Sequence, residues 1–202
     1  MRTPESLRDQ FTAQAETASA VVNRVAGLSQ ALVYAVDIGL RKKACQQLMS
    51  SCVETLCQKE PAKTLAAPNL PPNAWSELQV LCAESGLALT TGSLRDYLAG
   101  IDIGLTIADY GIAETGTLVI DSQHEAVRLA TMISEIHIAI LPMNRIRPTA
   151  DALQDELGAL MAAAPSYLAF ITGASRTADI ERVLAIGVHG PLELHILLTE
   201  ET

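Results

Sequence analysis

Two stretches of the chain combine glycines with hydroxyl and ionisable side chains, which suits the binding or chemistry of a small ligand. The first, ADYGIAETGT, covers residues 108–117, and the second, ITGASRTADIERVLAIGVHGP, covers residues 171–191. Each follows an apolar run that is typical of a buried strand. Open α/β sheets bind ligands at the carboxyl ends of their strands. Both stretches are therefore candidate parts of a site at that edge.

The first stretch offers two carboxylates, Asp109 and Glu114, as candidate proton acceptors or nucleophiles. Gly116 lets the backbone bend and approach a ligand closely, and Thr115 and Thr117 add hydroxyl groups. The structural alternative is that both carboxylates only cap backbone amides in a crossover loop. The residue types leave both interpretations open.

The second stretch predicts a cradle for phosphate or carboxylate. A strand is expected to end near Gly173, and Ser175 and Thr177 stand where a helix is expected to begin. The free N–H groups of a helix N-terminus attract anions, and Arg176 would add a counter-charge. Asp179 completes this candidate set. The alternative is that a hydroxyl here only caps the helix.

His189 precedes Gly190 and Pro191, so it is expected in a turn, where an imidazole could transfer protons near neutral pH. Such a histidine could equally hold the turn by bonding the backbone. Ser175, Asp179 and His189 follow the chain order of α/β-hydrolase triads. However, the nucleophile elbow of those enzymes requires glycine where this chain has Thr177, which argues against a hydrolase.

No pattern in the chain predicts a metal or a nucleotide cofactor. Cys45, Cys52, Cys57 and Cys82 are spaced for neither zinc nor iron–sulfur clusters, and we interpret them as small core residues. The other histidines, His137 among them, show no ligand spacing. Neither a Walker loop nor G-x-G-x-x-G is present.

Composition narrows the classes of partner. With 14 basic and 23 acidic residues the net charge is −9, and only 3% of residues are aromatic, which argues against nucleic acid. No run of 18 apolar residues appears, so no membrane span is expected. The charged N-terminus lacks an apolar signal core, and we expect a cytoplasmic protein.

Apolar periodicity predicts alternating strands and helices. We expect an N-terminal helix over residues 1–27 and an α/β region over residues 28–202, a single domain overall. Strands are expected at residues 31–36, 63–67, 87–90, 101–107, 117–120, 137–141, 167–172 and 193–198. The principal later helices are expected from Asp37 to about Cys57, over a segment that includes residues 75–82 and stops at Gly86, from the capping box at Ser122 through Ile133, and from Thr149 to about Ala163. This order favours a three-layer α/β fold, a mostly parallel sheet with helices on both faces.

Two local predictions concern helix ends. Gly86 should stop the helix before it, since glycine adopts the left-handed conformation of a C-cap. Ser122 and Glu125 have the spacing of a capping box for the helix that carries Arg128.

Three strings resemble the LUD domain family of lactate-utilisation proteins. They are TIADYGIAETGTLVI at residues 106–120, HIAILP at residues 137–142, and ITGASRTADIERVLAIGVHGPLELHILL at residues 171–198. Arg128 belongs to the same resemblance, which covers roughly residues 30–200, and joins the candidate ligand-binding residues. The resemblance implies a three-layer fold similar to that of CoA transferases and sugar-phosphate isomerases.

The resemblance also implies a function: support of L-lactate oxidation to pyruvate beside iron–sulfur partner proteins, whose clusters carry the electrons. Glu114 or His189 would then accept a proton, while Arg176 and its hydroxyl neighbours would hold a small carboxylate or phosphate. The turn at Glu114 is similar to the glutamate turn of CoA transferases, with Thr115 in place of asparagine. Two alternatives stay open: a free-standing enzyme of CoA-transferase or isomerase type, and a binding module for a phosphorylated or carboxylated small molecule.

Overall fold

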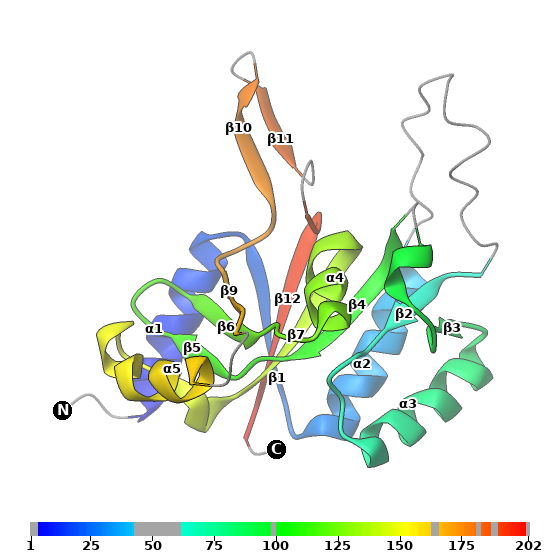
Figure 1. The fold of residues 1–202 in the computed structure, drawn as a ribbon, viewed down its shortest axis with the longest axis horizontal. Helices are drawn as coiled ribbons and strands as arrows, with labels where there is room; N and C mark the ends of the chain where they lie inside the picture. The colour runs from blue at the N-terminus through cyan, green and yellow to red at the C-terminus, as the bar shows by residue number, and fades with distance from the viewer. Residues whose placement is uncertain are drawn as a thin grey trace.

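The computed structural model describes residues 4–42, 62–97, 100–162, 166–180, 183–186 and 190–200, with the backbone alone for residues 176–180 and 183–186. Its centre is a parallel sheet of six strands in the order β1-β12-β7-β4-β2-β3 (Figure 1). The strands are β1 (Ala20–Val25), β12 (Glu193–Thr199), β7 (Ser134–Pro142), β4 (Ile101–Ile107), β2 (Thr64–Ala66) and β3 (Ala88–Leu89). The predicted mostly parallel α/β sheet is confirmed.

One face of this sheet packs against α2 (Leu28–Arg41) and α3 (Pro72–Ser85). The alternation predicted for residues 101–107 is observed from Ile103 onward: Ile103 and Leu105 of β4 enter this core with Leu32 and Leu78 of the two helices, whereas Ile101 packs near Ala130. Helix α3 ends as expected, because Gly86 adopts φ 72° at its C-cap and donates its backbone N–H to the carbonyl of Cys82.

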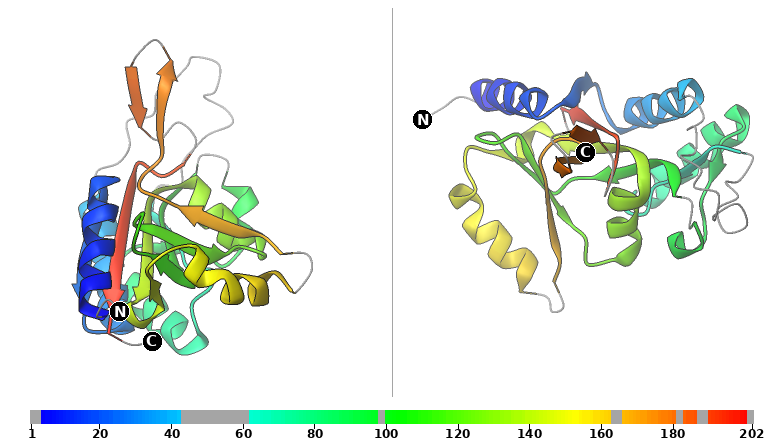
Figure 2. Two further views of the ribbon diagram at one scale, coloured as in Figure 1. Left: turned by 90° about the vertical axis from the view of Figure 1, so that its left-hand side faces the viewer. Right: turned by 90° about the horizontal axis from the view of Figure 1, so that it is seen from above.

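The opposite face of β4 carries Gly104, on which α4 (Glu125–Ile133) packs so closely that a Cβ there would lie 2.2 Å from the carbonyl oxygen of Ala130. In Figure 2, α2 and α4 lie on opposite sides of the central sheet. Helices on both faces were predicted, and they are present.

A second sheet extends the layer on the α4 side. Its strands, in spatial order, are β8 (Ile146–Arg147), β5 (Tyr110–Ile112), β6 (Thr117–Asp121) and β9 (Leu168–Ile171). Leu118 and Ile120 share a core with Phe11 of α1 (Pro4–Thr17). On the other side, Val119 packs with residues of α5 (Gln154–Met161) and the short helix η3 (Asp151–Leu153). The sequence did not separate these strands from the parallel sheet.

The remaining described elements are two 3-10 helices, η1 (Leu94–Asp96) and η2 (Met143–Arg145), and a hairpin of β10 (Arg176–Ile180) and β11 (Val183–Ile186). The hairpin projects away from the body of the protein (Figures 1 and 2). No helix in the described ranges is long and apolar enough to cross a membrane.

The N-terminal region differs from the prediction. Helix α1 ends at Thr17, and residues 20–25 form a strand where the helix was expected to continue. Residues 31–36, expected as a strand, lie inside α2. Ala31, Leu32, Ala35, Val36 and Gly39 are buried along one face with helical spacing, which an unbroken apolar run conceals. The helix expected over residues 37–57 has in fact begun at Leu28, and its predicted continuation, with Cys45, Cys52 and Cys57, lies outside the described residues.

Three further local predictions are wrong, the first of them only in its burial. The strand expected at residues 167–172 is present as β9, but it lies at the edge of the second sheet, and Phe170 is half exposed. The chain after Ser175 enters the hairpin and not a helix. The N-cap of α4 is His124 without a side-chain bond, because the Ser122 hydroxyl donates instead to the carbonyl of Tyr167 at 3.0 Å.

Candidate functional site

Asp109 and Glu114 of the first glycine stretch lie apart from any described ligand hollow. The Asp109 carboxylate follows β4 and accepts the backbone N–H of Asp121 at 2.6 Å, which ties it to β6. Burial raises the pKa of the Asp109 carboxyl, and the charge of Asp121 adds to this, whereas Arg145 opposes it. The Glu114 side chain is exposed. The contacts of Asp109 therefore fit the structural alternative of a carboxylate that caps a backbone amide.

A chain of hydroxyl groups joins the two glycine stretches. Thr115 Oγ1 lies 2.7 Å from Thr117 Oγ1, which lies 2.7 Å from Thr172 Oγ1 at the end of β9. Thr172 is the residue before Gly173. The structure therefore brings the two bends together, as a site built from both would require.

Both bends pack against the end of α1, and this explains their glycines. Gly116 has φ +65°, and a Cβ there would lie 2.3 Å from the backbone nitrogen of Ala15. Gly173 has φ +71°, and a Cβ there would lie 2.0 Å from the carbonyl oxygen of Ala18. Only glycine combines a left-handed backbone with so close an approach.

The second stretch closes on the segment that precedes β12. The Ser175 backbone N–H donates to the carbonyl of Pro191 at 3.0 Å, and a Cβ on Gly190 would touch Ser175. Arg176, Thr177 and Asp179 lie in β10, of which the structure describes only the backbone. His189 lies outside the described residues. Because no helix begins here, the predicted helix N-terminus is not available to hold an anion.

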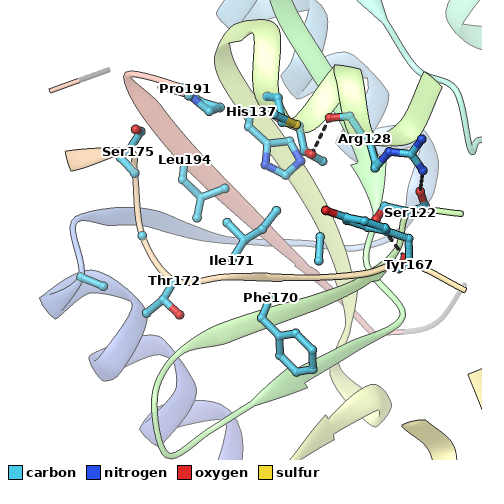
Figure 3. Close-up of a pocket in the computed structure, with 17 residues that line it drawn as sticks. Ser122, Arg128, His137, Tyr167, Phe170, Ile171, Thr172, Ser175, Pro191 and Leu194 are labelled. Atoms are coloured by element: carbon cyan, nitrogen blue, oxygen red, sulfur yellow. Dashed lines mark hydrogen bonds between the residues drawn. The ribbon is translucent and has the colours of Figure 1, made fainter. Parts of the chain in front are cut away.

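A hollow of about 570 Å³ lies between α4, the α4-side face of β7 and β12, and the segment from Tyr167 to Ser175 (Figure 3). Of the predicted site residues, Arg128, Gly173 and Ser175 line it, whereas Asp109, Glu114 and Thr117 are not among its described lining residues. A volume of this size is in the usual range for small-molecule sites.

The hollow does not lie at the carboxyl ends of the parallel strands. His137 of β7 and Leu194 of β12, which are paired in register, line it near the amino ends of their strands. The second glycine stretch reaches it because β9 belongs to the other sheet and runs antiparallel to β6. This stretch therefore lines a hollow that lies away from the carboxyl edge of the parallel sheet, where the sequence led us to expect a site.

His137 is a lining residue that the sequence analysis passed over. Its side chain is 1% exposed and points toward the middle of the hollow, toward Tyr167 and Ile171 (Figure 3). Its Nε2 lies 2.8 Å from Thr106 Oγ1, and its Nδ1 has no hydrogen-bond partner. Burial lowers the pKa of the imidazole to about 4, so it is neutral at physiological pH. The available signal was a histidine at the start of the apolar run of residues 138–141.

Arg128 is the one charged side chain among the described lining residues. Its Nη1 donates to the carbonyls of Ser122 at 2.6 Å and Gln123 at 3.0 Å, and its guanidinium lies 5.1 Å from the centre of the Tyr167 ring. Within the described part of the chain, its Nε and Nη2 have no hydrogen-bond partner. The hollow thus carries a fixed positive charge in a chain of net charge −9.

The described residues hold no group of three His, Cys, Asp or Glu side chains placed to bind a metal ion. The parallel sheet with helices on both faces defines an α/β domain, and the lining of its hollow includes one arginine and one buried neutral imidazole. A model of the LUD domain matches residues 8–199, so the chain belongs to the LUD domain family.

Curated relatives are similar over half of this chain. A Lactate utilization protein C from Halalkalibacterium halodurans is 38% identical over 103 residues, which are 50% of this chain and 45% of that protein. A Lactate utilization protein C from Bacillus subtilis is 33% identical over 103 residues, 50% of this chain and 43% of that protein. The matched part therefore spans less than half the length of these relatives.

A solved structure shows the same fold over nearly the whole chain. A DUF162 family protein from Deinococcus radiodurans has a TM-score of 0.63 and 16% sequence identity, covering 98% of this chain and 99% of that one. At this identity the likeness concerns the fold alone.

Proposed function

We propose that this chain is a component of a lactate-utilisation system and supports the oxidation of L-lactate to pyruvate together with iron–sulfur partner proteins. Membership of the LUD domain family and the relatives named Lactate utilization protein C support this role. Within the system, the chain would bind a small carboxylate in the hollow beside α4.

The proposal of a carboxylate ligand rests on the hydrogen bonds of Arg128. Its Nη1 is held by two carbonyl groups, which fixes the guanidinium, while the Nε and Nη2 edge keeps its donors free among the described residues. A guanidinium edge binds a carboxylate through two parallel hydrogen bonds. The surrounding walls are largely apolar, so water competes less well for these donors.

Oxidation of lactate to pyruvate removes two electrons and two protons from the substrate. Iron–sulfur clusters of the partner proteins would accept the electrons, and the residues of this chain would hold the acid. Glu114, His189 and Asp109 remain proposed proton acceptors and Arg176 a proposed counter-charge, although Glu114 and Asp109 are not among the described lining residues of the hollow that would hold the acid. A Glu114→Gln chain that supports lactate oxidation normally would remove the first of these roles.

Growth of a deletion strain on L-lactate as sole carbon source tests the role. The strain should fail on L-lactate but grow on pyruvate, and the wild-type gene should restore growth. Arg128→Gln should restore it poorly. Arg95→Gln is the matched control, because Arg95 is an exposed arginine paired with Glu125 and is not among the described lining residues. Normal growth of the deletion strain on L-lactate would contradict the proposal.

Partner binding needs a separate experiment. A tagged chain purified from lactate-grown cells should bring down proteins with the visible absorbance of iron–sulfur clusters, and Arg128→Gln should retain them because its effect is on the ligand. Recovery of the chain without any cluster-containing protein would argue against the partner part of the proposal.

A second candidate is a module that binds a carboxylate without turnover. It is favoured by the lining of the hollow, whose described residues include an arginine, hydroxyl groups and a shielded neutral imidazole but no carboxylate. Ligand binding by the purified chain, combined with normal growth of the deletion strain on lactate, would select this candidate. The CoA-transferase alternative draws no support from Glu114, which is exposed and absent from the described lining.

A further inference from the structure

We propose that His137 is a neutral hydrogen-bond donor of the hollow, that Thr106 fixes its Nδ1–H tautomer, and that the hollow binds 2-oxo and 2-hydroxy acids, those with a larger apolar side group more tightly than those with a methyl group. The inference deepens the proposed carboxylate-binding role of the same hollow and rests on it. It names His137 as the residue that donates a hydrogen bond to a second oxygen of the ligand, and it specifies the size of the ligand's apolar part.

The tautomer follows from the hydrogen bonds of Thr106. This side chain is fully buried, and in the described structure its hydroxyl has one partner, Nε2 of His137 at 2.8 Å. If Nε2 carried the proton, the hydroxyl hydrogen of Thr106 would have no acceptor and Nδ1 would also lack a donor. If the hydroxyl donates to Nε2, only the Nδ1–H group remains without a partner. The second arrangement leaves fewer buried groups unsatisfied.

The unpartnered Nδ1 points to a ligand. Nearly all buried polar groups in native proteins have a hydrogen-bond partner, so each exception calls for an explanation. His137 lines the hollow with its imidazole directed toward the centre (Figure 3), and the atom without a partner is Nδ1. The lowered pKa keeps the ring of His137 uncharged. Its Nδ1–H group therefore needs an acceptor oxygen on the ligand, and that oxygen need not be charged.

Two donors in one hollow define the head of the ligand. Arg128 supplies the charge for a carboxylate, and His137 supplies a neutral donor for a second oxygen. A carbonyl or hydroxyl oxygen on the carbon next to the carboxylate meets this requirement with the smallest molecule.

The apolar lining residues of the hollow indicate how large the apolar part of the ligand is. Met132, Phe170, Ile171 and Leu194 line the hollow, which at about 570 Å³ is in the range that encloses drug-sized molecules. A three-carbon acid fills only a small part of such a volume. An aromatic or branched side group would bury apolar surface against these walls and so bind more tightly than a methyl group.

The experiment compares two phenyl acids that differ in one oxygen. Phenylpyruvate and 3-phenylpropionate would be titrated into the purified full chain by calorimetry, with L-lactate and pyruvate as small references. Phenylpyruvate should bind about tenfold more tightly than 3-phenylpropionate, the ratio typical of one added neutral hydrogen bond. It should also bind more tightly than pyruvate. In His137→Phe the advantage of phenylpyruvate over 3-phenylpropionate should disappear.

Nitrogen NMR of the free wild-type chain provides a readout that needs neither ligand nor variant. It should show His137 protonated at Nδ1 and not at Nε2, and phenylpyruvate should shift the Nδ1 signal. Thr106→Val should abolish the single tautomer while leaving His137 in place. Protonation at Nε2 in the free wild-type chain would overturn the inference, even if His137→Phe failed to fold.

The outcomes separate this inference from the proposed function. Equal binding of the two phenyl acids, or an unchanged His137 signal on addition of phenylpyruvate, would overturn the inference while Arg128-dependent growth on lactate still stood. Absence of any carboxylate binding would overturn both the inference and the ligand part of the proposed function.

Discussion

Replacement of Gly173 by alanine tests the close packing of the segment after β9 against Ala18, which positions one side of the hollow. Gly173 has φ +71°, and a Cβ there would lie 2.0 Å from the carbonyl oxygen of Ala18 and 3.0 Å from its Cβ. The left-handed backbone alone costs an alanine about 1–2 kcal/mol. The contact is with backbone, which cannot rotate aside, so overpacking adds about 1–3 kcal/mol. We expect Gly173→Ala to lower the free energy of unfolding by about 2–5 kcal/mol.

Gly86→Ala is the matched control. Gly86 has φ +72°, but a Cβ there would meet nothing within 4 Å. Its replacement should cost only the backbone part, about 1–2 kcal/mol. Urea unfolding followed by circular dichroism would give both changes as shifts in midpoint at constant slope. If Gly173→Ala cost no more than Gly86→Ala, the close approach to Ala18 could not be the reason for glycine at this position.

Three further predictions concern buried ionisable groups. The pKa of His137 falls from 6.5 to about 4 on folding, so the unfolded state binds more protons between these values; stability should decrease by up to about 3 kcal/mol as pH falls from 7 to 4, and less in His137→Phe, by urea unfolding at each pH. Asp102→Asn removes the charge that accepts a 2.9 Å bond from buried Lys42 and bonds from Thr64, while Lys42 keeps its ion pair with Glu135; it should cost about 1.5–3 kcal/mol, more than Glu125→Gln at an exposed pair, and equal losses would contradict this. Burial raises the pKa of the Cys82 thiol to about 11, so mass spectrometry should find it alkylated by iodoacetamide at pH 8 only after unfolding.

The fold was predictable where local pattern and tertiary position agree. The alternating residues of β4 have one apolar face against α2 and α3 and small or polar residues on the other, so period two was visible in the sequence. Gly86 was predictable as a helix stop because its role depends on its own backbone. Residues 31–36 were misassigned because an apolar run carries no period, and only burial along one face of α2 distinguishes helix from strand.

The candidate site was less predictable because the role of each residue depends on contacts with residues far away in the sequence. His137 looks like one more residue of a buried strand until Thr106 on the adjacent strand occupies Nε2 and leaves Nδ1 without a partner in a side chain that lines a hollow. The glycines near Ser175 suggested a helix start, since glycine and hydroxyl residues are common in both helix caps and hairpin connections. The sequence contains no local signal that decides between these two outcomes.

The sequence strings that resemble the LUD family contain candidate ligand-binding residues and also a packing contact between two bends and the end of α1. We call this contact the joint. Gly116 and Gly173 approach the end of α1 too closely for any side chain, and Thr117 and Thr172 bridge the two bends. Ala18, against which Gly173 packs, is itself a lining residue of the hollow. The joint therefore holds the β9 segment opposite β7, at the distance that leaves room for a ligand beside His137. The width of the hollow therefore depends on two glycines, of which Gly173 lines it and Gly116 is not among its described lining residues.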